Sequence, residues 1–110
     1  MTSSDPAAPY EALADVIERE LVVIPERDFD ALAALKRERA AIVRTLPMRP
    51  PLGARAALER CTLLQARVRI EMQRVSEQIL LELRQVGHAQ RAARGYAPVR
   101  APRVRISASA

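Results

Sequence analysis

Residues 54–93 read ARAALERCTLLQARVRIEMQRVSEQILLELRQVGHAQRAA. Good helix formers dominate this stretch, and it contains no proline. Its apolar residues recur at steps of four or three, which places them on one face of a helix. The members of this stripe are Ala57, Cys61, Leu64, Val68, Met72, Val75, Ile79, Leu83 and Val86. The pattern predicts an amphipathic helix over about 54–93, roughly 60 Å long.

The preceding stretch, 9–46, carries a similar stripe. Four of its apolar residues are spaced eleven positions apart, or three helical turns: Leu13, Ile24, Leu35 and Leu46. Pro25 breaks the hydrogen-bond pattern of a helix interior, but the apolar spacing continues past it. We therefore predict one long helix over 9–46 that is kinked or interrupted near residues 23–28. If the helix restarts there, Asp28 is placed to cap it.

A connector separates the two stretches, because three prolines fall within residues 47–51. The predicted fold is all-α: a hairpin of two long antiparallel helices that occupies 9–94, with its helices at about 9–46 and 54–93. Residues 1–8 are expected to be disordered, and 95–110 are expected to form a basic, flexible tail that contains two prolines.

Charge is unevenly distributed along the chain, whose formal net charge is +5. Residues 1–30 carry eight acids and two arginines, whereas residues 83–110 carry six arginines and no acid. In an antiparallel hairpin these two ends would lie close enough to attract each other. Part of the basic excess would then be neutralised within the molecule.

Residues that support catalysis or metal binding are not grouped in the sequence. His88 is the only histidine, and no second histidine or cysteine stands at metal-ligand spacing from it. The single cysteine, Cys61, lies on the apolar stripe, so we expect a buried thiol. No catalytic residues, metal site, cofactor or small-molecule ligand is predicted. The sequence shows neither a secretory signal nor a membrane-spanning run, which predicts a cytoplasmic protein.

Binding is the function that remains. Leu80 and Leu81 lie off the main stripe and widen the apolar surface of the second helix. An apolar patch of this kind usually marks a partner site, although a kinked first helix would also cover it. The basic tail is compatible with nucleic acid, but the long helices mix both signs of charge and the basic region has only Tyr96 for base stacking. Nucleic acid is therefore not the favoured partner.

Two segments resemble flagellar export chaperones of the FliT/FlgN type. The first is the acidic and aromatic segment 26–32, ERDFDAL, followed by Leu35 and the charged cluster 36–39. The second is Arg94-Gly95-Tyr96, which follows the last long helix. The resemblance implies a cytoplasmic chaperone that binds the helical C-terminal segment of a secreted flagellar protein and delivers it to the export gate.

The resemblance also implies where the partners bind. By position, Tyr96 would contact the gate protein FlhA. Helix-in-groove recognition would use the C-terminal half of the second helix. The predicted substrate-binding residues are Met72, Val75, Ile79, Leu80, Leu83 and Val86.

Three alternatives stay open at this stage. A FliT-like protein would serve the filament cap protein, which the short chain favours, whereas a FlgN-like protein would serve the hook-filament junction proteins. The competing class is a structural coiled-coil or helical-bundle subunit, in which a homodimer covers its own apolar surface.

Overall fold

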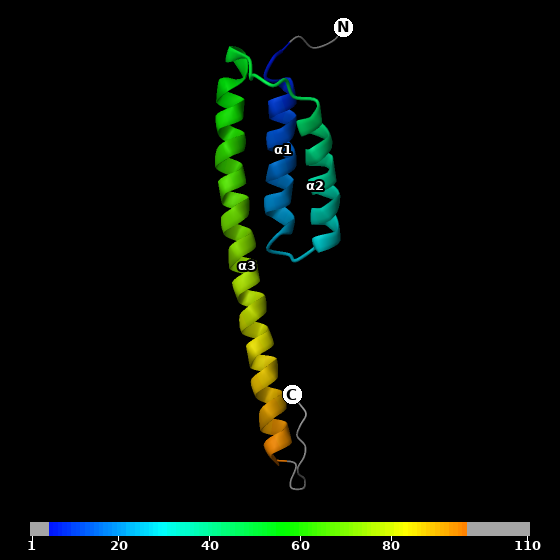
Figure 1. Ribbon diagram of the computed structural model, residues 1–110, viewed down its shortest axis with the longest axis vertical. Coiled ribbons are helices and arrows are strands. Elements are labelled where there is room, and N and C mark those ends of the chain that lie inside the picture. The colour runs from blue at the N-terminus through cyan, green and yellow to red at the C-terminus, as the bar shows by residue number, and fades with distance from the viewer. Residues whose placement is uncertain (1–4, 97–110) are drawn as a thin grey trace. The chain divides into compact units, whose positions relative to one another are not determined.

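The structure is a computed structural model that describes residues 5–96. Within that range every regular element is helical. The elements are α1 (Ala8–Val23), α2 (Phe29–Arg44), a short 3₁₀ turn (Leu52–Ala54) and α3 (Arg55–Tyr96) (Figure 1). The chain divides into two units, Met1–Val75 and Ser76–Ala110. The first holds α1, α2 and the first half of α3, and the second holds the rest of α3. The predicted all-α class is confirmed.

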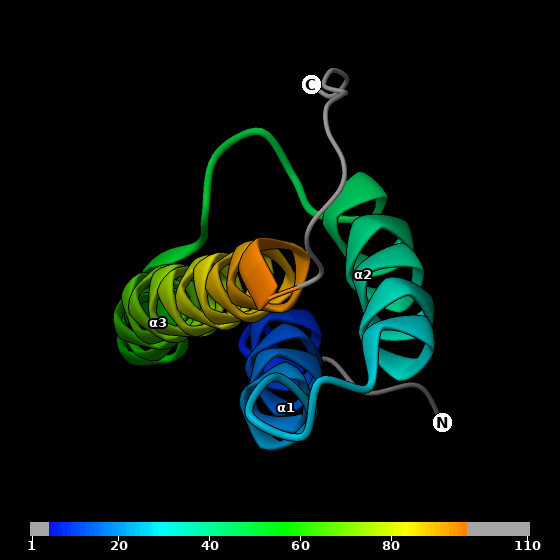
Figure 2. The same ribbon diagram turned by 90° about the horizontal axis from the view of Figure 1, so that it is seen from below.

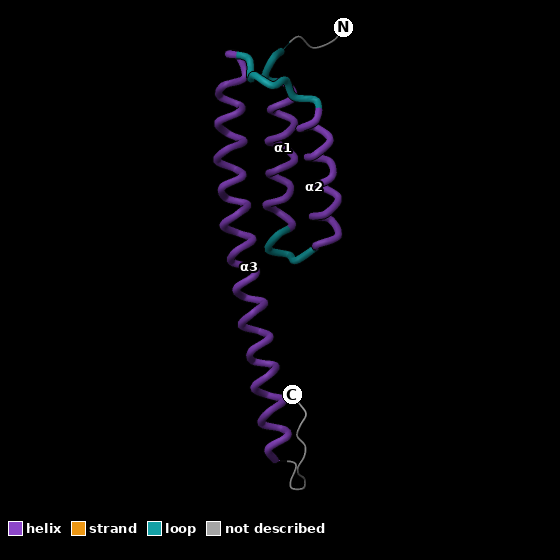
Figure 3. Tube along the Cα trace, in the orientation of Figure 1, coloured by secondary structure: helices purple, strands orange, loops and turns teal. Residues whose placement is uncertain are grey.

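The single helix predicted over 9–46 is wrong, because the chain reverses after Val23. Figure 3 shows the reversal as a short loop between α1 and α2. The N–H of Arg27 donates to the carbonyl of Ile24 at 2.9 Å, and the N–H of Asp28 donates to the carbonyl of Val23 at 3.3 Å. Arg27 adopts the left-handed conformation, with φ of 58°. This pair of bonds is the Schellman motif, which ends a helix and turns the chain away from its axis.

Asp28 starts the second helix. Its side chain accepts a hydrogen bond from the N–H of Ala31 at 3.1 Å, as expected for a helix that restarts at this point. The result is three helices where the sequence predicted a two-helix hairpin.

The N-terminal end of α1 is fixed by Asp5. The Asp5 side chain accepts a hydrogen bond from the N–H of Ala7 at 2.9 Å, and its carbonyl accepts one from the N–H of Ala8 at 3.1 Å. The predicted disordered segment 1–8 therefore includes four residues, 5–8, that the structure describes as a turn and the first residue of α1. Residues 1–4 lie outside the described range.

In the first unit, α1 packs against both of its neighbours (Figures 1 and 2). It runs antiparallel to α2 and parallel to the first half of α3. α1 therefore holds more buried side chains than α2 or α3, and Leu32 is the one residue of α2 that is buried. The position between two helices explains this difference, because α1 has neighbours on two sides.

Two apolar clusters hold α1 against α3. One surrounds Tyr10, and the other joins residues of α1 to Cys61. Small side chains lie at these contacts and allow the helix axes to approach closely. The buried members are Ala7, Tyr10, Ala54 and Ala57 in the first cluster and Leu13, Ala14, Ile17 and Cys61 in the second. The Cys61 thiol donates to the carbonyl of Tyr10 at 3.2 Å, so the prediction of a buried thiol is confirmed.

The acids of α1 pair with arginines inside the first unit. Arg60 of α3 lies 2.8 Å from Glu18, 3.6 Å from Asp15 and 3.8 Å from Glu11. The hydrogen bond that the Arg60 guanidinium donates to Glu18, together with the charges of the three carboxylates, raises the pKa of Arg60. The attraction expected from the sequence, between the acidic start of the chain and arginines after residue 83, depended on a two-helix hairpin, which the three helices replace.

The second unit holds residues 76–96 of α3 as helix. The helix continues to Tyr96, three residues beyond the predicted end at 93, and includes Gly95. The rest of the predicted flexible tail, residues 97–110, lies outside the described range.

Candidate partner-binding surface

The second unit presents large apolar side chains on one side of its helix. Leu80, Leu83 and Val86 are 52%, 61% and 52% exposed, and Ile79 is half-buried. Residues three and four positions apart are neighbours on a helix, so these four form one continuous surface, which we name the α3 apolar face. Leu81 is also 51% exposed but points to a different side of the helix.

The predicted substrate-binding residues divide between the two units. Ile79, Leu80, Leu83 and Val86 belong to the second unit, whereas Met72 and Val75 belong to the first. Val75 is 4% exposed, so its side chain belongs to the core. Met72 is half-buried and lines a pocket of the first unit. The α3 apolar face is therefore the accessible part of the predicted set.

Tyr96, the predicted contact for the export gate, is the last residue of α3. Its side chain lies outside the part of the chain that the structure describes. The three arginines that precede it on the helix, Arg84, Arg91 and Arg94, are exposed. The C-terminal part of the second unit thus carries positive charge next to its apolar residues.

A buried ion pair in the first unit was missed by the sequence analysis. Glu20 of α1 is fully buried, and both of its carboxylate oxygens accept hydrogen bonds from Arg39 of α2, at 2.8 and 3.2 Å. The signal was present in the sequence, because Glu20 stands three residues after Ile17 and four before Ile24. An acid at an apolar position of a helix needs a partner when the helix packs.

Among residues 5–96, no group of three His, Cys, Asp or Glu side chains is placed to hold a metal ion. No helix in the same range has the length and hydropathy needed to cross a bilayer.

Comparisons with known proteins give no match for this chain. No family model, no curated protein and no solved structure is similar to it.

Proposed function

We propose that the protein is a flagellar export chaperone that binds the amphipathic C-terminal helix of a secreted flagellar protein. The main observation that supports this proposal is the exposure of Leu80, Leu83 and Val86 on one side of α3. These side chains are already about half covered, so completing their burial against a partner helix contributes roughly 1 kcal/mol each, and an exposed apolar surface of this kind favours a partner.

The recognition would follow the helix-in-groove mode. An amphipathic helix buries apolar residues at positions i, i+3, i+4 and i+7. In the α3 apolar face, Ile79, Leu83 and Val86 stand at i, i+4 and i+7, and Leu80 widens the surface beside them. The four side chains of that face are aliphatic, so they offer a partner apolar contacts and no hydrogen bonds. The partner is therefore selected by its apolar pattern and by charges at the rim.

The family assignment is supported by the sequence resemblance of residues 26–39 and 94–96 to FliT and FlgN. The proposal follows the FliT-like form, with the filament cap protein as the substrate, delivery to FlhA through Tyr96, and action in the cytoplasm without catalysis. A FlgN-like chaperone for hook-filament junction proteins is the second form of the same proposal.

The test is binding of a synthetic peptide from the C-terminal helix of the filament cap protein, measured by calorimetry. Leu80→Asp/Leu83→Asp is expected to weaken binding at least ~30-fold, because two apolar contacts are replaced by desolvated charges. The matched control is Leu52→Asp/Leu63→Asp, which changes two exposed leucines of the first unit and should leave the affinity unchanged.

Equal affinity of the wild type and the Leu80/Leu83 variant for the peptide would contradict the proposed surface. A peptide from a hook-filament junction protein, titrated in parallel, distinguishes the FlgN-like form. The remaining alternative is a closed structural homodimer, and sedimentation tests it by measuring the molar mass of the protein with and without peptide. Such a dimer would associate through the same face and would not dissociate when either peptide is added.

A further inference from the structure

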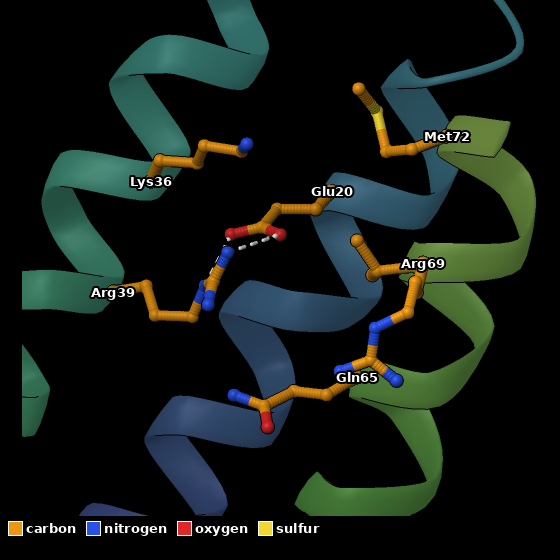
Figure 4. Close-up of a pocket in the computed structure, with 7 residues that line it drawn as sticks. Glu20, Lys36, Arg39, Gln65, Arg69 and Met72 are labelled. Atoms are coloured by element: carbon orange, nitrogen blue, oxygen red, sulfur yellow. Dashed lines mark hydrogen bonds and ion pairs between the residues drawn. The ribbon is translucent and has the colours of Figure 1, made fainter. Parts of the chain in front are cut away.

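A half-open pocket of about 450 Å³ lies in the first unit, where α1, α2 and α3 meet (Figure 4). Each helix contributes to its wall, and all of the contributing residues precede Ser76. The lining combines charged groups with apolar ones: Glu20, Lys36, Arg39, Val68, Arg69 and Met72.

The charges of this pocket are unbalanced. Arg39 is neutralised by Glu20, which accepts two hydrogen bonds from its guanidinium. Lys36 and Arg69 have no hydrogen bond or ion pair with any residue in the range 5–96. In Figure 4 they stand on either side of the Glu20–Arg39 pair. Two positive charges thus line the pocket without a counter-charge from the described chain.

The unbalanced charges favour an anion. Lys36 supplies a compact ammonium, and Arg69 supplies a planar guanidinium that holds a carboxylate through two parallel hydrogen bonds. Both side chains are exposed, and an anion in the pocket would accept charge-assisted hydrogen bonds from them in place of water. The ligand therefore needs an acidic head group.

The apolar part of the lining specifies the rest of the ligand. Val68 and Met72 are four residues apart on α3, so they are neighbours on the same side of the helix, and both are half-buried. Methionine adapts its shape to different aliphatic groups. A ligand with a short hydrocarbon stem would cover these side chains, whereas a fully hydrated anion would leave them in water.

We propose that this pocket binds a carboxylate on a short apolar stem, with the carboxylate held by Lys36 and Arg69 and the stem packed on Val68 and Met72. The carboxylate has two sources, a free aliphatic acid or an acidic side chain of a bound helical peptide. The proposal concerns the first unit alone and does not require the chaperone function. It adds a ligand class that the sequence analysis did not predict.

The experiment is a titration of the full chain with sodium hexanoate at constant ionic strength, followed by NMR signals of the Lys36 and Arg69 side chains. We expect saturable shifts at both side chains. The double substitution Lys36→Gln/Arg69→Gln should weaken the affinity at least ~10-fold, because both contacts to the carboxylate are lost.

The matched control is Arg37→Gln/Arg67→Gln. It removes the same net charge from exposed neighbours of Lys36 and Arg69 that do not line this pocket. This control should bind hexanoate as the wild type does. Equal weakening in both double variants would overturn the proposal, because it would reduce the effect to general attraction of an anion by a basic protein. Wild-type titration without saturable shifts would also overturn it.

Two further titrations test the stem and the source. Acetate should bind about tenfold more weakly than hexanoate, and Met72→Gln should reduce that preference; equal affinity for the two acids in the wild type would overturn the role of the stem. A designed amphipathic peptide with one central Glu, compared with its Gln form, distinguishes the sources. If the Glu peptide binds more tightly than the Gln peptide, and this difference disappears in Lys36→Gln/Arg69→Gln, the pocket binds an acidic side chain of a peptide. If the two peptides bind equally, the ligand of the pocket is a free acid.

Discussion

The Glu20–Arg39 ion pair in the first unit carries a large desolvation penalty, since the Glu20 carboxylate is withdrawn from water. Replacement of one member leaves the other without its partner, which costs roughly 3 kcal/mol for a buried pair. We expect Arg39→Gln to lower the free energy of unfolding by about 2–3 kcal/mol, because 26% of the Arg39 side chain remains exposed. Urea denaturation followed by circular dichroism measures the change.

The nearby Arg19–Glu38 pair is a matched control for this prediction. It also joins α1 to α2, at 2.7 Å, but about half of each side chain is exposed. Exposed pairs contribute roughly 0–1 kcal/mol, so Arg19→Gln should have a small effect. Similar losses in Arg19→Gln and Arg39→Gln would show that burial does not distinguish the two pairs.

Cys61 makes stability depend on pH. Burial, as the largest cause, raises the pKa of its thiol above the ordinary value of 9.0. The folded chain therefore keeps the thiol proton at pH values where the unfolded chain releases it, and stability falls as pH rises above 9.0. We expect the wild type to lose more stability between pH 8 and pH 10 than Cys61→Ala does. Parallel denaturation curves of the two proteins over that range would contradict this assignment.

Arg27 determines how α1 ends, and it occupies a backbone conformation that favours glycine. An L residue in the left-handed region costs roughly 1 kcal/mol relative to glycine. We therefore expect Arg27→Gly to raise the free energy of unfolding by about 1 kcal/mol, measured as an increase in Tm. Glu26→Gly serves as the control, because Glu26 has a negative φ and glycine there should lower the Tm.

The reversal at residues 24–28 also explains what the sequence of the first two helices did not reveal. The eleven-residue spacing of Leu13, Ile24 and Leu35 is satisfied in a continuous helix and in two helices that each turn an apolar side to the core. The usual marker of a Schellman turn is glycine at the position that Arg27 occupies. Only Pro25 and the capping Asp28 signalled the break, and neither specifies a change of direction.

At the scale of the whole molecule, the core lies within the first unit. The side chains that are buried in the described chain all belong to residues 7–75. We expect a chain that ends after Val75 to unfold cooperatively with a Tm within about 5 °C of the full chain, and to lose helical ellipticity in proportion to the removed residues. Loss of cooperative unfolding in the shortened chain would show that residues after 75 contribute to the core.

The stripe of residues 54–93 predicted α3 correctly, because a long segment with one apolar side and no proline has few alternatives to helix. The stripe did not predict which of its members are covered. Cys61 and Val75 are buried and Leu83 is exposed, although all three occupy equivalent positions in the pattern. Cys61 and Val75 belong to the first unit, which also holds α1 and α2, whereas Leu83 belongs to the second unit. The pocket at Lys36 depends on the same three-helix arrangement.

Lys36 is the only lysine of this arginine-rich chain. Reductive methylation with ¹³C-formaldehyde would therefore mark one side-chain amine and would preserve its positive charge. The resulting methyl signal would stand inside the pocket between the three helices, distinct from that of the α-amino group by its chemical shift. A chain with seventeen arginines and one lysine thus carries a built-in spectroscopic reporter at the pocket that Lys36 lines.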